Sequence, residues 1–178
     1  MIAGASLQHE NDGPTPMRVQ RYEFRPMTTG DLPMIRRWLA EPHVREWWGD
    51  PDEQFGLVSG DMNEPAMDQY IVSTEAKPFA YLQCYRLTDW NICFGPQPGE
   101  TRGIDQMIGE PDMIERGHGS AFIRQFIGAL LDRGTPRVVT DPDPVNTRAV
   151  RAYEKAGFVR DKLVDTPDGI ALLMVRNA

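Results

Sequence analysis

Between residues 102 and 158 the chain alternates twice between short extended patterns and helical ones, and this alternation limits the folds open to it. Strands are expected at Arg102–Gly109 and Arg137–Thr140, and a helix is expected after each of them. The first helix begins near Gly117, and the second ends at Gly157. Strands that alternate with helices in this way favour a mixed α/β sheet covered by helices.

The flanking segments add further elements to this unit. The alternating stretch Val19–Phe24 is typical of a first strand. Two helices are expected after it; the first opens on a capping box at Thr28–Asp31 and stops at Pro42. Further strands are predicted at Tyr70–Val72, Phe79–Tyr85, Phe158–Val164 and Ile170–Val175, the last two joined by a turn at Thr166–Gly169. The prediction is an α/β (α+β) fold with about six to seven strands and about four helices.

The helix that ends at Gly157 carries a regular set of side chains. Asp143 is expected as its N-cap. Asn146, Val150 and Tyr153 follow at positions i, i+4 and i+7, which places them on one helical face. They span about 10 Å along the helix axis, so an amide and a phenol could contact an extended ligand at two points. A half-buried packing role for Tyr153 explains the same spacing.

The glycine turn Arg116–Ser120, just before the earlier helix, has the features of an anion site. Its glycines let backbone N–H groups approach a ligand, and the helix N-terminus adds a partial positive charge. Arg116 and Arg124 lie nearby in the sequence and could hold a pyrophosphate. A plain turn explains this pattern equally well, and neither a complete GxGxxG nor a P-loop lysine is present. Nicotinamide and nucleoside-triphosphate sites are therefore not indicated.

The charge balance narrows the partners that we expect. There are 19 Lys and Arg against 26 Asp and Glu, a net charge of -7, which disfavours a nucleic-acid binder and suits a cationic ligand or simple solubility. No apolar run reaches the roughly 18 residues of a membrane helix, and no signal-peptide pattern opens the chain. Cys84, Cys93 and three scattered histidines predict no metal site. We expect a cytoplasmic protein with a disordered tail at residues 1–17 and one domain at 18–178.

The strand, the glycine turn, the helix, the next strand, the Asn-x-x-Ala-x-x-x-Tyr helix and Gly157-Phe158 together resemble the Gcn5-related N-acetyltransferase (GNAT) family. The resemblance covers the second half of the chain and implies a V-shaped splay between two strands that hold acetyl-CoA. Ile114, three residues before Gly117, stands where the family usually has Gln or Arg. In this family the residue at that position contacts the cofactor mainly through its backbone. The cofactor contacts that the resemblance implies are Met107, Arg116, Gly117, His118, Gly119, Ser120 and Asn146.

A narrower resemblance, to the aminoglycoside 6'-N-acetyltransferases, covers nearly the whole ordered chain. It rests on Glu46–Gly49, Arg102–Gln106, Thr140–Pro142, Tyr153–Phe158 and Thr166–Gly169. It implies direct acetyl transfer to a primary amine, with antibiotic resistance as the type of activity. Siderophore and lysine-type N-acyltransferases share some of these features, and a non-catalytic acyl-CoA-binding module is a third interpretation. A binding module, however, needs neither Asp105 nor Tyr153.

The resemblance places Asp105 beside the attacked amine and Tyr153 beside the sulfur. An alkylamine is mostly protonated at neutral pH, so Asp105 holds the ammonium and either accepts its proton or only orients it. Tyr153, with an ordinary pKa of about 10, stays protonated and can donate to the departing thiolate. A backbone N–H near Met107 is expected to polarise the thioester carbonyl. Neither cysteine has a nearby histidine to activate it as a nucleophile.

Recognition of the acceptor is expected to be electrostatic. Carboxylates on loops and strand ends can meet in one cleft, where a polycationic aminosugar binds and where salt weakens binding. One ring of the Trp47–Trp48 pair is expected to pack inside, and the other to face the cleft. The expected acceptor contacts are Trp48, Asp89, Trp90, Asp105, Asp141 and Asp168. The expected partner is a small cationic amine, bound by a monomer or a homodimer.

Overall fold

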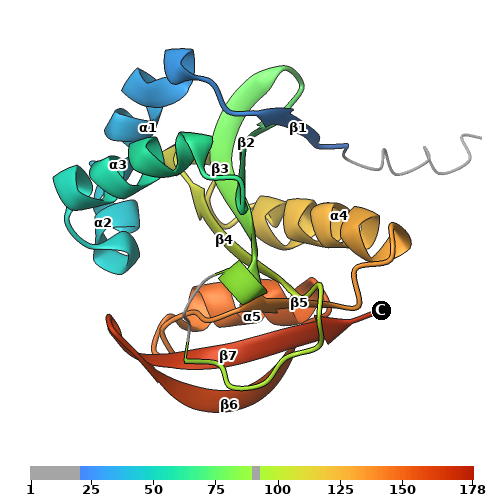
Figure 1. The fold of residues 1–178 in the computed structure, drawn as a ribbon. Helices are drawn as coiled ribbons and strands as arrows, with labels where there is room; N and C mark the ends of the chain where they lie inside the picture. The colour runs from blue at the N-terminus through green and yellow to red at the C-terminus, as the bar shows by residue number, and fades with distance from the viewer. Residues whose placement is uncertain (1–20, 90–92) are drawn as a thin grey trace, which may run out of the picture.

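The computed structural model describes residues 21–89 and 93–178, and Figure 1 shows them as one sheet with helices on its faces. The strands are β1 (Glu23–Pro26), β2 (Met67–Thr74), β3 (Lys77–Arg86), β4 (Arg102–Ile108), β5 (Arg137–Thr140), β6 (Val159–Thr166) and β7 (Gly169–Asn177). The helices are α1 (Leu32–Leu39), α2 (Pro42–Trp48), α3 (Pro51–Gly60), α4 (His118–Asp132) and α5 (Thr147–Lys155). The tail expected at residues 1–17, and Trp90, lie outside the described residues.

The seven strands lie in the order β1-β2-β3-β4-β5-β7-β6. The β4–β5 pair is parallel and the other pairs are antiparallel, so the predicted mixed sheet is confirmed. Within the described residues no helix is both long and apolar enough to cross a membrane.

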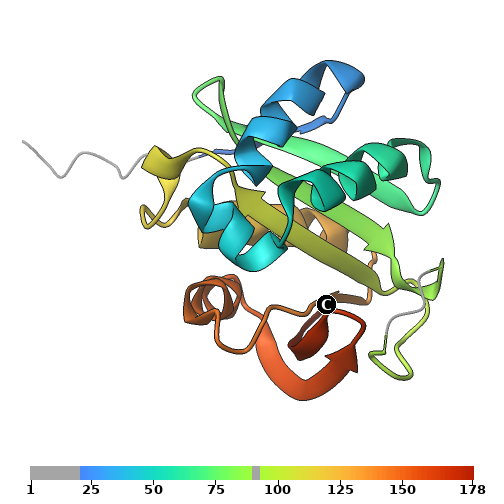
Figure 2. The same cartoon turned by 90° about the vertical axis from the view of Figure 1, so that its left-hand side faces the viewer.

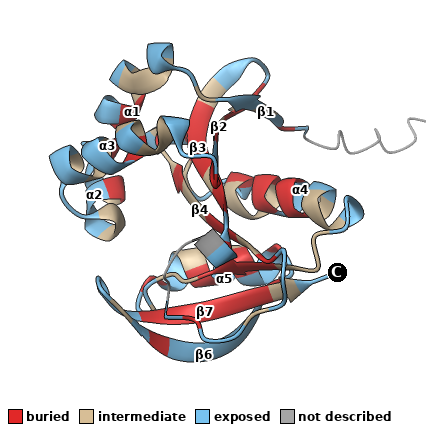
Figure 3. Cartoon of the chain, in the orientation of Figure 1, coloured by how far each residue is buried: buried red, intermediate tan, exposed pale blue. Residues whose placement is uncertain are grey.

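The helices form two layers, which Figures 1 and 2 show from two directions. Helices α1–α3 pack on one face of β2–β4 around Trp38, which is fully buried with Ile71 and Tyr81. Helices α4 and α5 cover the other face, where Phe122 and Val150 enter a larger core. Figure 3 shows buried residues along β3, β4 and β7 and on the inner side of α4. The central strands therefore pack against a core on each face of the sheet.

The N-terminal helical layer has three helices where two were expected. Pro42 does not merely stop α1; it is the first residue of α2, a position that needs no backbone N–H. Pro51 opens α3 in the same way, after Asp50 caps the N–H groups of Asp52 and Glu53. The chain thus has five α-helices among its described residues, one more than predicted.

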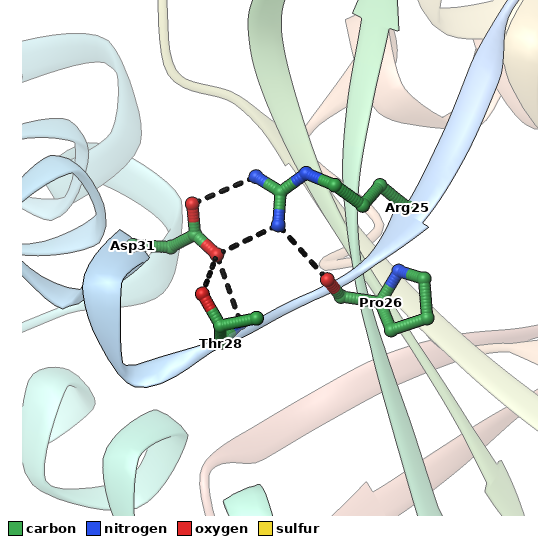
Figure 4. A network of polar contacts seen from close by, with 4 residues as sticks. All are labelled: Arg25, Pro26, Thr28 and Asp31. Carbon is green, nitrogen blue, oxygen red and sulfur yellow. Dashed lines mark hydrogen bonds and ion pairs between the residues drawn. The ribbon is translucent and has the colours of Figure 1, made fainter.

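The capping box predicted at Thr28–Asp31 is present and joins β1 to the helical layer (Figure 4). The Asp31 carboxylate accepts from the Thr28 N–H at 2.8 Å and from both terminal nitrogens of Arg25 at 2.9 and 2.7 Å. The Arg25 guanidinium holds the pKa of Asp31 at about 2. This bidentate pair fixes the direction in which the chain leaves the sheet edge and enters α1.

The sheet opens between its two central strands. β4 pairs with β5 only at Arg102–Val138 and Gly103–Val139, and the two strands part beyond these residues. The predicted V-shaped splay is therefore confirmed. The ring of Tyr85 covers Gly103, where an added Cβ would lie 2.2 Å from two ring carbons. Glycine is required at this point because the tyrosine ring takes the space of a side chain.

Candidate active site

A cavity of about 500 Å³ lies at the splay, between α2, the end of β4, the start of α4 and α5. Both Trp47 and Trp48 line it and are half-buried; the Trp48 ring also makes an edge contact with Tyr81, at 6.0 Å between centroids. Five of the predicted cofactor residues line this cavity: Met107, Gly117, Gly119, Ser120 and Asn146. The topology therefore brings together segments that are far apart in the sequence.

The glycine turn presents a helix N-terminus to this cavity. Gly117 is the N-cap of α4 in the left-handed conformation, with φ of 83° and no side-chain cap. A Cβ there would meet nothing within 4 Å, so glycine is favoured by its backbone angle rather than by space. The N–H groups of His118, Gly119 and Ser120 have no acceptor within the helix. The turn is thus open and suits an anionic group.

Two of the predicted cofactor contacts, Arg116 and His118, are not among the residues that line the cavity. The His118 imidazole is buried against the rings of Tyr22 and Phe79, with its Nδ1 3.0 Å from the Tyr22 hydroxyl. His118 can therefore offer a ligand its backbone N–H but not its ring. Arg116 is exposed, and Arg124 donates to the carbonyl of Lys155 instead of facing the turn.

Three cations that the sequence analysis missed do line the cavity, namely Arg148, Arg151 and Lys155 of α5. Their spacing of i, i+3 and i+7 is that of one helical face, and this signal could have found them. The positive side chains that line the cavity therefore come from α5 rather than from the residues flanking the glycine turn.

Asn146 combines a structural and a cavity-lining position. Its Oδ1 accepts from the Ala149 N–H at 3.0 Å, so Asn146 is the N-cap of α5. The predicted cap, Asp143, instead accepts from the N–H of Val145 in the preceding turn. Val150 and Tyr153 are buried on the face of α5 that was predicted for them.

Asp105 is half-buried on β4, and Gln83 of β3 donates to its Oδ2 at 2.9 Å. Burial raises the pKa of Asp105, while the hydrogen bond from Gln83 partly opposes the shift. A carboxylate with a raised pKa is a better proton acceptor than an exposed one.

Two of the predicted acceptor carboxylates, Asp105 and Asp168, act on a third, Asp141. Burial, followed by the charges of Asp105 and Asp168, raises the pKa of Asp141 to about 8. Asp168 is exposed in the turn between β6 and β7, where Thr166 accepts from its N–H at 3.3 Å. Trp90, also predicted for this site, lies outside the described residues, and the structure does not describe the side chain of Asp89. We call Asp105, Asp141 and Asp168 the acidic cluster.

Tyr153 reaches the site from the opposite side of the sheet, out of the core that α4 and α5 share. It is 4% exposed, and burial raises its pKa above that of an ordinary phenol. The charges of Asp105 and Asp141 raise the pKa further, whereas hydrogen bonds with Thr140 and Gln106 oppose this. The phenol is therefore protonated at neutral pH and close enough to Asp105 to respond to its charge.

The direction of the backbone N–H groups on β4 differs from the prediction for Met107. The Gly109 N–H donates to the Phe79 carbonyl at one end of the β3–β4 ladder, and the Leu87 N–H donates to the Thr101 carbonyl at the other. These two bonds determine which N–H groups of β4 point toward β3, since the direction alternates from residue to residue. By that alternation the Met107 N–H points to β3, and the N–H groups of Gln106 and Ile108 point to the opening. The carbonyl of Ile108 on the same edge accepts from His43 Nε2 at 2.8 Å.

Comparison with known proteins decides the family. A family model described as an acetyltransferase (GNAT) domain matches residues 28–166. The chain belongs to the GNAT acetyltransferase family. It is 35% identical over 171 residues to aminoglycoside N(6')-acetyltransferase type 1 of Klebsiella pneumoniae, over 86% of this chain and 81% of that protein.

Two further proteins are similar to this GNAT enzyme. A structure of AAC(6')-Ib in complex with paromomycin and acetyl-CoA superposes with a TM-score of 0.79 and 32% identity, over 88% of this chain and 93% of that one. A lysine N-acyltransferase of Mycobacterium sp. (strain MCS) is 25% identical over 156 residues, over 81% of this chain and 62% of that protein.

The GNAT site also contains polar groups that the sequence analysis did not single out. Tyr85 lies under the acidic cluster: burial raises the pKa of its phenol, and the charges of Asp105 and Asp141 raise it further. Gln83 and Gln106 contact the two predicted catalytic residues. Because β3 has the composition of a core strand, its polar positions gave no sign of function.

Proposed function

We propose that this enzyme transfers the acetyl group of acetyl-CoA directly to the 6'-amine of an aminoglycoside. The acidic cluster carries the proposal, because three carboxylates gathered on one side of the splay suit a small polycation. Asp105 and Asp141 are close enough for the charge of one to raise the pKa of the other. The similarity to aminoglycoside N(6')-acetyltransferases supports the same acceptor class.

The residues of the cavity fit acetyl-CoA as the donor. The free N–H groups at the start of α4 suit a pyrophosphate, and Arg148, Arg151 and Lys155 supply positive charge along α5. Gln106 and Ile108 present backbone N–H groups on the open edge of β4, where an extended pantetheine arm can add as a strand. The donor side of the site is therefore cationic and the acceptor side anionic.

The proposed reaction divides its proton transfers between the two predicted catalytic residues. Asp105 holds the acceptor ammonium and takes its proton, so that the neutral amine can attack the thioester carbon. A backbone N–H on the open edge of β4 stabilises the negative charge that develops on the carbonyl oxygen. Tyr153 donates its proton to the sulfur as the carbon–sulfur bond breaks. The acylated nitrogen then loses its remaining extra proton to solvent, and solvent returns a proton to the phenolate of Tyr153.

Release of free CoA thiol tests the acceptor class. Purified protein is mixed with acetyl-CoA and with kanamycin, tobramycin or a lysine derivative. Release with the aminoglycosides supports the proposal. Release with lysine derivatives alone assigns the enzyme to the second candidate, which the similarity to a lysine N-acyltransferase favours. Absence of release with every amine supports a non-catalytic acyl-CoA-binding module.

The proposal includes a cytoplasmic location and a small cationic amine as partner. One domain at residues 18–178, and assembly as a monomer or a homodimer, stay predictions.

Binding of an aminoglycoside at pH 7 is expected to release a proton from Asp141. Its pKa of about 8 leaves this carboxyl mostly protonated in the free enzyme, and an incoming cation favours the charged form. The pKa therefore falls on binding and the proton leaves. Calorimetric titrations in buffers of different ionisation enthalpy measure the number of protons exchanged.

The matched control for this titration is Asp143→Asn, since Asp143 is exposed in the neighbouring turn. Asp141→Asn is expected to reduce the net proton release by up to one per bound acceptor and to weaken the salt dependence of binding. Proton exchange that is the same in Asp141→Asn and the unmodified enzyme contradicts the prediction.

A further inference from the structure

A row of polar side chains runs across the sheet beneath the acidic cluster. Gln69 of β2 is the cross-strand partner of Gln83, and Gln83 is the cross-strand partner of Asp105. Laterally paired residues point to the same face of a sheet. The three side chains therefore form a polar row on the face covered by α1–α3, which is otherwise lined by the apolar core around Trp38.

Tyr81 fixes the orientation of the middle member of this row. It precedes Gln83 by two residues on β3, so both side chains point to one face. The Tyr81 hydroxyl donates to Gln83 Oε1 at 2.8 Å, and Gln83 Nε2 donates to Asp105 Oδ2 at 2.9 Å. Tyr81 is fully buried, and burial keeps its phenol protonated and able to donate.

The direction of these two hydrogen bonds determines which group of the Gln83 amide faces Asp105. With its oxygen engaged by the phenol, the amide must turn its N–H₂ toward the carboxylate, and an N–H donor stabilises the charged form. A reversed amide would place an oxygen against Asp105 and favour the protonated form. The hydroxyl of a residue outside the cavity thus selects the amide orientation that keeps Asp105 charged.

The other titratable groups near Asp105 offer it no positive charge. The groups that respond to its charge are Tyr81, Cys84 and Tyr85 of β3, Asp141 after β5 and Tyr153 of α5, and Asp168 acts on Asp141. Among the described residues no lysine, arginine or histidine forms an ion pair with Asp105. Gln83 is therefore a described donor whose hydrogen bond offsets the effect of burial on Asp105.

We propose that Gln83 is a positioning residue that holds Asp105 in the charged form and that Tyr81 orients the Gln83 amide for this task. The inference rests on the proposed function for its catalytic consequence, because a charged Asp105 is the form that binds the acceptor ammonium. The protonation of Asp105 itself is a property of the free protein and can be measured without an acceptor.

The test is a titration of Asp105 by carboxyl carbon NMR on protein labelled at its aspartates, with the signal assigned by its loss in Asp105→Asn. Gln83→Leu is expected to raise the pKa of Asp105 by about one to two units, the shift that a hydrogen bond to a charged group supports. Tyr81→Phe is expected to shift it the same way by less, because the freed amide can turn. Tyr70→Phe removes the same atom from a ring packed on Phe126 in the other core, and no shift is expected.

The pH dependence of kcat/KM gives a second readout. In Gln83→Leu the acidic limb should move up in pH by the same amount, with activity recovering on the alkaline side of that limb. A loss of activity that is equal at every pH, or an Asp105 titration unchanged in folded Gln83→Leu or Tyr81→Phe, overturns the proposal. If Gln83→Leu does not fold, the Tyr81→Phe titration decides. If no amine releases CoA while the titration shifts as expected, the proposed function fails and this inference stands.

Discussion

Replacement of Asp105 by asparagine is expected to lower kcat/KM for an aminoglycoside about 10²- to 10⁴-fold, the range typical for loss of a general base. Asparagine keeps the shape of the side chain and can still accept from Gln83, so the fold should persist. It cannot take a proton, and it carries no charge to hold the ammonium. Steady-state kinetics with acetyl-CoA and kanamycin measure the loss.

Two further measurements separate this effect from damage to the donor side. Binding of acetyl-CoA should be unchanged in Asp105→Asn, because the cavity is lined by α4 and α5 on that side. Asp168→Asn is the matched variant, and it should lose less activity because Asp168 is exposed in the turn between β6 and β7. Turnover in Asp105→Asn close to that of the unmodified enzyme would remove Asp105 from the base role.

Local signals predicted the second half of the fold well. The position of α4 follows from its N-cap Gly117, whose left-handed backbone suits glycine, and from the apolar face that includes Phe122 and Ile127. The hairpin of β6 and β7 follows from Thr166–Gly169, where the Thr166 hydroxyl donates to the Gly169 carbonyl at 2.9 Å. In these segments the residues that decide the structure are adjacent in the sequence.

The N-terminal helical layer was harder to predict because a proline can either end one helix or begin the next. Pro42 ends one helical pattern and begins the next, and the sequence shows only the interruption. The same kind of ambiguity affected Asp143 and Asn146, since either residue can cap a helix that follows. The choice of Asn146 depends on where the chain leaves β5, which is a tertiary property.

The grouping of the candidate site was predicted, but not the direction of each polar group. Asp105, Asp141 and Asp168 come together as expected. The N–H of Met107 points away from the opening because the register with β3 sets the alternation of β4, and that register is not a local signal. Likewise, the burial of His118 depends on Tyr22, which directly precedes β1 and lies 96 residues away in the sequence.

The distribution of charge differs between the two sides of the splay. The chain is acidic overall, and its acidic cluster serves the acceptor side of the splay. The donor side draws its cations from one face of α5, where Arg148, Arg151 and Lys155 line the cavity. The net charge of a chain therefore says little about the sign of the local charge on either side of a two-substrate site.

Replacement of Tyr153 by phenylalanine is expected to lower kcat at least about 10²-fold, or about 2.7 kcal/mol in the activation free energy, with little change in acetyl-CoA affinity. The substitution removes one oxygen from a ring that is packed against Phe158, with centroids 5.4 Å apart, and it leaves that contact in place. Without the phenolic proton the sulfur must leave as an unassisted thiolate. The Kd for acetyl-CoA from calorimetry and kcat from thiol release measure the two quantities separately.

The matched control is Tyr70→Phe, because the Tyr70 ring packs against the same core but its hydroxyl is not among the partners of Asp105 or Tyr153. Tyr70→Phe should retain the kcat of the unmodified enzyme, so a loss confined to Tyr153→Phe reports the donated proton rather than a general cost of removing a buried hydroxyl. The raised pKa of Tyr153 adds a pH criterion: the phenol stays protonated through the neutral range, so the defect of Tyr153→Phe should not vary between pH 6 and 8. Unchanged turnover, or a defect that disappears within that range, would mean that the proton reaches the sulfur from another group.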